Sequence, residues 1–243
     1  MNEVRTPWFE LLCAACFITA FLLVALGMFG NVEGGNMDSA VWFPWHPVLM
    51  ALSYPCCMGL GRLAYIARLD LSINVRRAWH GSCMALGVLA ALLGYYAIFK
   101  AHWPKSQFFG YDFATHEWKP MSRIVHSLLG YVIIIASVIQ GMAGPMKIRA
   151  IRAGQRVFTW HGTLGKRIIV AAMVNLLLAV YFWGWSMRMK LPLGLVLLGS
   201  GLLARLLPRH MGPQIASQPL VTATGPGADD TASNEMTELA ASS

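Results

Sequence analysis

Charged residues are scarce in this chain of 243 residues, making up 12% of it against 56% hydrophobic residues. A soluble domain carries about 25% charged residues, so the composition excludes an ordinary soluble fold. Acidic residues are rarest within the long apolar runs, which argues against a proton-driven transporter. The net charge of +8 is not gathered in a basic stripe on a soluble module, so we expect no nucleic-acid partner.

Cysteine is also sparse, and its spacing excludes two common kinds of site. A zinc or iron–sulfur centre needs closely spaced cysteines in a polar loop. All the cysteines of this chain lie within apolar runs, where packing is the expected role and no disulfide framework is implied. They are Cys13, Cys16, Cys56, Cys57 and Cys83.

The chain is instead dominated by long apolar runs. Roughly 20 residues cross a bilayer as a helix. Six runs reach or approach this length: Trp8–Gly30, Trp42–Ile66, Ala78–Phe99, Ile124–Pro145, Phe158–Trp183 and Leu191–Leu207. The last run is short and holds Arg205, so five spans followed by a loose helix are the alternative. We predict an all-α, polytopic membrane protein with six transmembrane helices around a central four-helix bundle.

Composition also divides the chain into two parts. The membrane domain is expected over residues 1–207. Residues 208–243 are rich in Pro, Gly, Ala, Ser and Thr, which cannot bury a core, so we expect a disordered cytoplasmic tail.

Basic residues concentrate in two of the predicted connections, at residues 62–77 and 147–156. Both connections lie on the same side of the membrane if all six runs cross it. The positive-inside rule makes that side cytoplasmic and places both termini there. A plasma membrane and a vacuolar or endosomal membrane are equally compatible with this topology.

Histidine occurs at one matched depth in four consecutive apolar runs. His46, His80, His126 and His161 each lie between the third and the fifth residue of their run. Because successive helices run in opposite directions, His46 and His126 come near one membrane face, and His80 and His161 near the other. Two imidazoles that face each other across a bundle hold a heme iron from both sides. We therefore predict two heme sites, one per leaflet, with irons about 20 Å apart.

The neighbours of these histidines add to the pattern. One histidine in a membrane helix is as well explained by a hydrogen bond to a neighbouring helix, but four at one depth are not. The last two are each followed four residues later by a glycine, Gly130 and Gly165. Such a glycine leaves room for a porphyrin edge, although close helix packing explains it equally well. Lys166 and Arg167 either pair with a heme propionate or extend to the cytoplasmic interface.

The longest outer connection, residues 100–122, holds His102 and His116. Proline and glycine lie between these two histidines, so we reject a continuous helix that stacks two hemes. An electron acceptor at the outer surface is expected near Lys105, His116 or Lys119.

Three stretches resemble heme-ligand motifs of the cytochrome b561 family. Residues 43–50, Phe-Pro-Trp-His-Pro-Val-Leu-Met, resemble its first motif. His126-Ser-Leu-Leu-Gly-Tyr, followed by Gln140-Gly, resembles a later one, and Trp160-His161-Gly-Thr-Leu-Gly, with Asn175 beyond it, resembles the last. The likeness covers about residues 8–207. The context of Gln140 and Asn175 is similar to the branch often fused to extracellular DOMON domains, although no such domain is recognised in this sequence.

The resemblance implies six helices, two b hemes, ascorbate as the cytoplasmic donor, and a ferric chelate or monodehydroascorbate as the acceptor on the other side. The ascorbate region of the family matches this chain by region only, at Arg68, Arg76, Arg77, Arg152 and Arg156. The family motif at the outer substrate site reads Ser-Leu-His-Ser-Trp, whereas residues 124–128 read Ile-Val-His-Ser-Leu. Donor and acceptor therefore stay open.

Our leading hypothesis is a trans-membrane, ascorbate-dependent reductase of ferric chelates or monodehydroascorbate. A second hypothesis is a heme-containing membrane subunit or sensor that passes electrons to a protein partner. A third is a heme-free transporter or scaffold whose histidines bind protons or metal. Membrane lipid is an expected partner in each case, and a homodimer is compatible with the sequence.

Overall fold

The computed structural model describes residues 7–30, 37–67, 71–155 and 157–210. Within these ranges, six helical spans are long and apolar enough to cross a membrane, as the sequence predicted. The sixth reaches from Met187 to Arg205, which favours six spans over the five-span alternative. The tail expected over residues 208–243 falls almost entirely outside the described residues and stays a prediction.

The spans are built from seven α-helices and one π-helical stretch. The first span is α1 (Pro7–Phe29), and the second joins α2 (Trp45–Ala51), the π-helical stretch η1 (Leu52–Met58) and α3 (Gly59–Ala67). The other four are α4 (Ile73–His102), α5 (Met121–Arg152), α6 (His161–Phe182) and α7 (Met187–His210). A single turn of 3-10 helix, η2 (Trp103–Lys105), follows α4.

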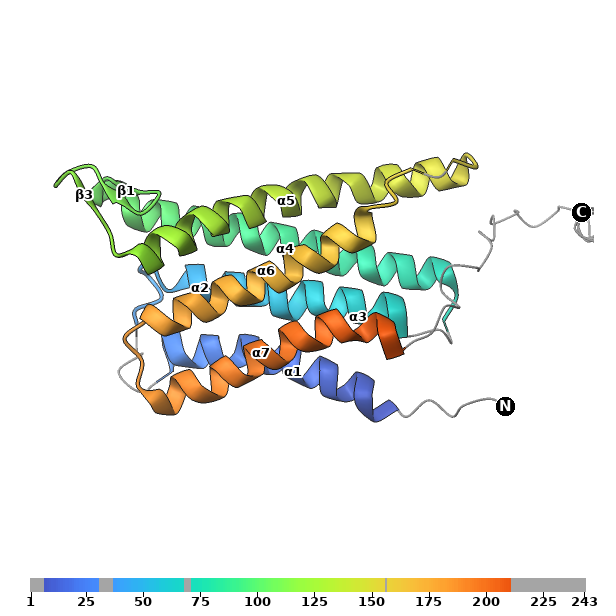
Figure 1. Cartoon of the computed structure of the whole chain (residues 1–243), viewed down its shortest axis with the longest axis horizontal. Coiled ribbons are helices and arrows are strands. Elements are labelled where there is room, and N and C mark those ends of the chain that lie inside the picture. The colour runs from blue at the N-terminus through green and yellow to red at the C-terminus, as the bar shows by residue number, and fades with distance from the viewer. Residues whose placement is uncertain (1–6, 31–36, 68–70, 156, 211–243) are drawn as a thin grey trace, which may run out of the picture.

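The spans form a ring in which each packs on the next along the chain, and α7 closes back on α1. Figure 1 views this bundle from the side, with the helices lying lengthwise. Across the middle of the ring, η1 contacts α6. The second span, α4, α5 and α6 therefore make a central four-helix bundle, as predicted. In this bundle the second span is diagonal to α5, and α4 is diagonal to α6.

The second span is not one uniform helix. Pro55 lies inside it, and a proline has no N–H to donate and a ring that clashes with the preceding helical turn. The backbone widens here into η1, and a π-helical turn adds a residue relative to a continuous α-helix. Ser53 Oγ donates to the Gly87 carbonyl at 2.7 Å and ties η1 to α4. The sequence predicted one plain helix over Trp42–Ile66, so this stretch was not foreseen.

The connection between α4 and α5 was expected to be an irregular loop, but it contains a three-stranded antiparallel sheet. The strands are β1 (Gln107–Phe108), β2 (Tyr111–Asp112) and β3 (Glu117–Trp118). They pair in the order β1-β2-β3. The strands are only two residues long, too short for an alternating pattern to reveal them in the sequence.

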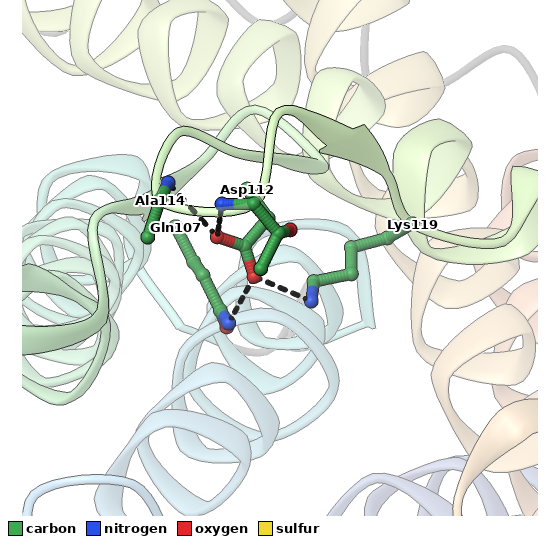
Figure 2. Close-up of polar contacts among 5 residues, drawn as sticks. Gln107, Asp112, Ala114 and Lys119 are labelled. Atoms are coloured by element: carbon green, nitrogen blue, oxygen red, sulfur yellow. Dashed lines mark hydrogen bonds and ion pairs between the residues drawn. The ribbon is translucent and has the colours of Figure 1, made fainter.

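A buried carboxylate organises this connection (Figure 2). Lys119 Nζ and Gln107 Nε2 donate to Asp112 Oδ2 at 2.9 and 2.7 Å. The backbone amides of Ala114 and Thr115 donate to Oδ1 at 3.1 and 3.3 Å. Lys119, together with the other donors, lowers the pKa of Asp112 from 3.8 to about 2. Asp112 therefore stays charged and holds Lys119 in place.

The two ends of the bundle differ, and we name them by what they hold. The sheet end carries β1–β3, and the basic end carries Arg76, Arg77 and Arg152 at the opposite ends of the same helices (Figure 1). Exposed tryptophans ring both ends, as in the aromatic belts of membrane proteins. They include Trp42, Trp103 and Trp118 at the sheet end and Trp8, Trp79 and Trp160 at the basic end.

Candidate functional site

Two of the predicted ligands face each other at the sheet end. His46 lies in the first turn of α2, and His126 lies near the start of α5, on the diagonal of the bundle. Their ring centroids are 6.3 Å apart and the rings are perpendicular. Pro47 follows His46 in the first turn of α2, where the missing N–H of proline costs nothing. The structure thus brings these two histidines together as predicted.

A cavity of about 310 Å³ surrounds this pair. Both histidines line it, with aliphatic side chains from α5 and α6 below and aromatic side chains of the α4–α5 connection above. Its volume falls in the range of about 300–1,000 Å³ that is usual for small-molecule and cofactor sites.

The ring nitrogens of three of the four histidines are fixed by main-chain carbonyls. The Nδ1 atom of His46 lies 3.0 Å from the Gly94 oxygen, and that of His126 lies 3.1 Å from the Asn175 oxygen. His80 Nδ1 lies 3.1 Å from the Gly61 oxygen. Because a carbonyl only accepts, each Nδ1 must donate, and this leaves the lone pair on Nε2 for a metal.

These carbonyls follow a regular spacing. Gly94 lies fourteen residues after His80, and Asn175 lies fourteen residues after His161. Each histidine is thus held by the helix that carries a histidine of the other site. Gly61 lies fifteen residues after His46, one more than the others. The π-helical stretch η1 lies between His46 and Gly61 and adds one residue to the helix. This extra residue brings the Gly61 carbonyl into register with His80.

The second pair of histidines lies at the basic end, on the other diagonal. His80 on α4 and His161 on α6 are close enough to interact electrostatically. The His80 ring centroid lies 5.3 Å from that of Tyr65 on α3. Within the described part of the chain, His161 Nδ1 is buried and has no hydrogen-bond partner. The main-chain oxygen of His161 accepts a hydrogen bond from Gln140 Nε2 on α5.

The residues at the sheet end fit a heme held by two histidines. With about 2 Å from a metal to an imidazole nitrogen, and about 1 Å more to the ring centre, two imidazoles on one metal have centroids about 6 Å apart. The His46–His126 separation of 6.3 Å matches this spacing. Both Nε2 atoms are available, because both Nδ1 atoms are engaged by carbonyls.

Two cations, Arg123 and Lys119, line the same cavity. The sequence reasoning named Lys119 only as an acceptor residue and missed Arg123. Arg123 precedes His126 by three residues and so shares its helix face, a signal that was present in the sequence. Its guanidinium carbon lies 5.8 Å from the Phe182 ring centroid. Cations at this position suit the carboxylates of a heme.

The glycines have different surroundings. A Cβ on Gly130 would meet only Asn175 Nδ2, at 3.4 Å, and a Cβ on Gly81 would meet nothing within 4 Å. A Cβ on Gly165 would lie 3.0 Å from Gln140 Nε2. Gly87 instead serves close packing, since a Cβ there would lie 2.9 Å from the Met58 side chain.

The predicted substrate and propionate residues are spread over both ends. Arg76 is buried, and its Nη1 donates to the Tyr65 carbonyl at 3.4 Å, so it joins α4 to α3. Arg68 and Arg156 lie outside the described residues. Of the rest, Arg77 and Lys166 are half-buried, and Arg152, Arg167, Lys105 and His116 are exposed. His102 ends α4 and His116 lies between β2 and β3, so the two do not share a helix.

Two further cations at the basic end were not predicted as site residues. Arg62 on α3 is half-buried, and its Nε has no partner among the described residues. Lys147 Nζ donates to the Phe158 carbonyl at 3.2 Å. It also interacts electrostatically with His161, so a positive charge lies beside that ligand candidate.

Comparison with known proteins agrees with this geometry. The family model of eukaryotic cytochrome b561 matches residues 45–186, from the start of α2 to just beyond α6. The match takes in all four histidines and more than half of the chain. A comparison with curated proteins found no match. The chain belongs to the cytochrome b561 family: it is a multi-pass membrane oxidoreductase that binds heme b and transfers electrons across the membrane.

Proposed function

We propose that this protein carries single electrons from cytoplasmic ascorbate, through two heme b sites, to a ferric chelate or monodehydroascorbate on the opposite side of the membrane. The observation that carries the proposal is the His46–His126 pair, 6.3 Å apart at one end of a bundle whose other end holds a second pair. Each heme, when bound, supplies an iron that accepts and releases one electron.

In this proposal His46 and His126 would hold the heme iron at the sheet end, and His80 and His161 would hold the one at the basic end. The main-chain carbonyls keep the rings of His46, His80 and His126 in one tautomer and one orientation. Iron held by two histidines would serve electron transfer rather than oxygen chemistry.

The carboxylates of each cofactor need cationic partners. At the sheet end, Arg123 and Lys119 line the cavity and suit this role. At the basic end we assign it to Lys166 and Arg167, as the sequence suggested. Charged residues within a membrane span are stabilised when they are paired.

Between the two sites the bundle is filled by packed side chains. Tyr54 is buried at 3% exposure, and its hydroxyl lies 3.4 Å from Ser137 Oγ on α5. Ser137 Oγ in turn donates to the Ile133 carbonyl at 2.7 Å. These contacts join the second span to α5 between the two proposed heme sites.

The direction of transfer follows from charge. We propose that the basic end is cytoplasmic, with both termini on that side, and that residues 208–243 form a tail there. Ascorbate, an anion, would bind at the basic end, where the candidates are Arg68, Arg76, Arg77, Arg152 and Arg156. The acceptor would bind at the sheet end near Lys105, His116 or Lys119, and the membrane is a plasma, vacuolar or endosomal one.

A visible spectrum of the detergent-purified full-length protein, taken during titration with ascorbate, tests the proposal. Two hemes per chain and rapid reduction would support it. Bound heme that ascorbate reduces slowly would contradict the choice of donor and favour transfer from a protein partner. A protein without heme, after expression with ample heme, would contradict the ligand assignment. The variant Arg152→Gln, at an exposed position away from the histidines, should slow reduction by ascorbate and leave the heme content unchanged.

A further inference from the structure

We infer that the side-chain amide of Gln140 is the hydrogen-bond partner of His161 Nδ1. Of the four histidines, His161 would then be positioned by a side chain, whereas the other three are positioned by the main chain. This inference rests on the proposed function, since it takes His161 to be a heme ligand. It makes Gln140 a positioning residue that sets the basicity of that ligand.

The first observation is a complementary pair of unsatisfied atoms. His161 Nδ1, a donor in the tautomer that coordinates through Nε2, is buried and has no partner among the residues that the structure describes. Gln140 Oε1, an acceptor, is likewise buried and has no partner among these residues. The two residues are already in contact, because Gln140 Nε2 donates to the His161 carbonyl. A hydrogen bond between the two atoms would satisfy both buried groups at once.

The second observation is position. Gln140 lies fourteen residues after His126, which is the spacing that Gly94 has from His80 and Asn175 has from His161. At those two positions a main-chain carbonyl meets the histidine of the neighbouring helix. At Gln140 the side chain takes that place, so the register of the bundle predicts that His161 and this residue interact.

The third observation is the room left for the amide. A Cβ on Gly165 would lie 3.0 Å from Gln140 Nε2, so a larger residue there would push the amide away from α6. On α5, a Cβ on Gly144 would lie 3.8 Å from His161 Cε1, which leaves space beside the ring. The two glycines let the ring and the amide lie against each other.

The chemical consequence is a difference in ligand basicity. A hydrogen bond from Nδ1 raises the electron density on the metal-bound nitrogen, and a stronger acceptor raises it further. Removing the acceptor should therefore raise the reduction potential of the basic-end heme. Replacing it with a carboxylate should lower that potential.

The test compares Gln140→Leu and Gln140→Glu with the full-length parent, in a His126→Ala background that retains only the basic-end heme. Potentiometric titration gives the midpoint potential, and transfer of heme to a soluble acceptor protein gives its retention. We expect the potential to rise in Gln140→Leu and to fall in Gln140→Glu. Loss of an outer-shell partner costs about 10–100-fold in metal affinity, so heme should leave Gln140→Leu faster by that order.

The matched control is Met142→Leu, in the same His126→Ala background. Met142 follows Gln140 by two residues on α5 and is exposed, so this change leaves the Gln140 amide in place. The potential of the basic-end heme should then be unchanged.

The outcomes separate the inference from the function on which it rests. If the parent binds no heme, or if His161→Ala retains both hemes, the ligand assignment itself fails. If the parent binds two hemes but neither Gln140 variant shifts the potential, only the inference is overturned. A fold defect in Gln140→Leu leaves Gln140→Glu as the deciding variant, because it preserves the shape of the side chain.

Discussion

The two histidine pairs sit at equivalent positions in the bundle, yet they are built differently. At the sheet end, both rings are held by main-chain carbonyls and face each other at 6.3 Å across a cavity of about 310 Å³. At the basic end, His80 is held by a carbonyl, whereas His161 Nδ1 has no partner among the described residues. In our proposal, helix register prepares the sheet-end site, while the basic-end site also depends on the side chain of Gln140.

The largest expected effect comes from removing a ligand at either end. His126→Ala should lose the sheet-end heme, and His161→Ala should lose the basic-end heme. Each variant should lower electron transfer across a vesicle membrane by at least about 100-fold, the upper end of what outer-shell changes cost. Heme content and vesicle reduction assays measure both. Retention of two hemes by either variant would contradict the pairing.

The difference between the two ends also predicts which site binds heme first. Because the two sheet-end histidines already have the spacing of two ligands on one iron and both are held by carbonyls, heme added below stoichiometry to the apoprotein should bind there first. His126→Ala should abolish this early phase and His161→Ala should leave it intact, as followed by absorbance. Equal early phases in the two variants would show that the sites are equally prepared.

A smaller effect is expected from adding a side chain at Gly94, where α4 packs closely on α2. In Gly94→Val, a Cβ would lie 3.1 Å from Leu49 Cβ and 3.4 Å from the His46 main-chain oxygen. Overpacking of this kind costs about 1–3 kcal/mol and should separate α2 from α4, which weakens heme binding at the sheet end. Thermal inactivation and heme content measure it. Gly81→Val, on the same helix with nothing within 4 Å of its Cβ, is the control and should behave as the parent.

A further prediction concerns the connection above the sheet-end cavity (Figure 2). The pKa of Asp112 is lowered from 3.8 to about 2, so its charge stabilises the connection fully above about pH 4. That stabilisation should be lost as the pH falls through about 2. Asp112→Asn should lack it at every pH, so hydrogen exchange in residues 107–119 should differ between parent and variant at pH 5 and converge near pH 2. A constant difference would contradict the assignment.

The smallest effect is expected midway between the two sites. Tyr54→Phe removes only a 3.4 Å contact with Ser137 Oγ, which keeps its bond to the Ile133 carbonyl. The loss should be about 0.5–1.5 kcal/mol of stability, the net value of one hydrogen bond, seen as a modest fall in the temperature of inactivation. Electron transfer should be unchanged because the ring remains. A tenfold slowing would instead place the hydroxyl on the electron path.

Much of this architecture could be predicted from the sequence. Long uncharged runs define the six spans, because each must satisfy its backbone within a bilayer. The matched depth of the histidines, together with alternating helix direction, predicts that His46 meets His126 at one end and that His80 meets His161 at the other. The cation Arg123 shares a helix face with His126 and could have been found in the same way.

The contacts that hold the histidines could not be predicted from the sequence. The carbonyls of Gly94, Gly61 and Asn175 hold their histidines from a different helix, and every residue has a carbonyl. Which of them meets an imidazole depends on the rotation and the axial register of packed helices, and on the residue that η1 adds to the second span. The strands β1–β3 are likewise too short to be recognised in the sequence. The spans and the matched depth of the four histidines follow from the sequence alone, because they depend on transfer into lipid and on chain connectivity. Which group holds each histidine follows from the folded structure, because it depends on how the helices pack.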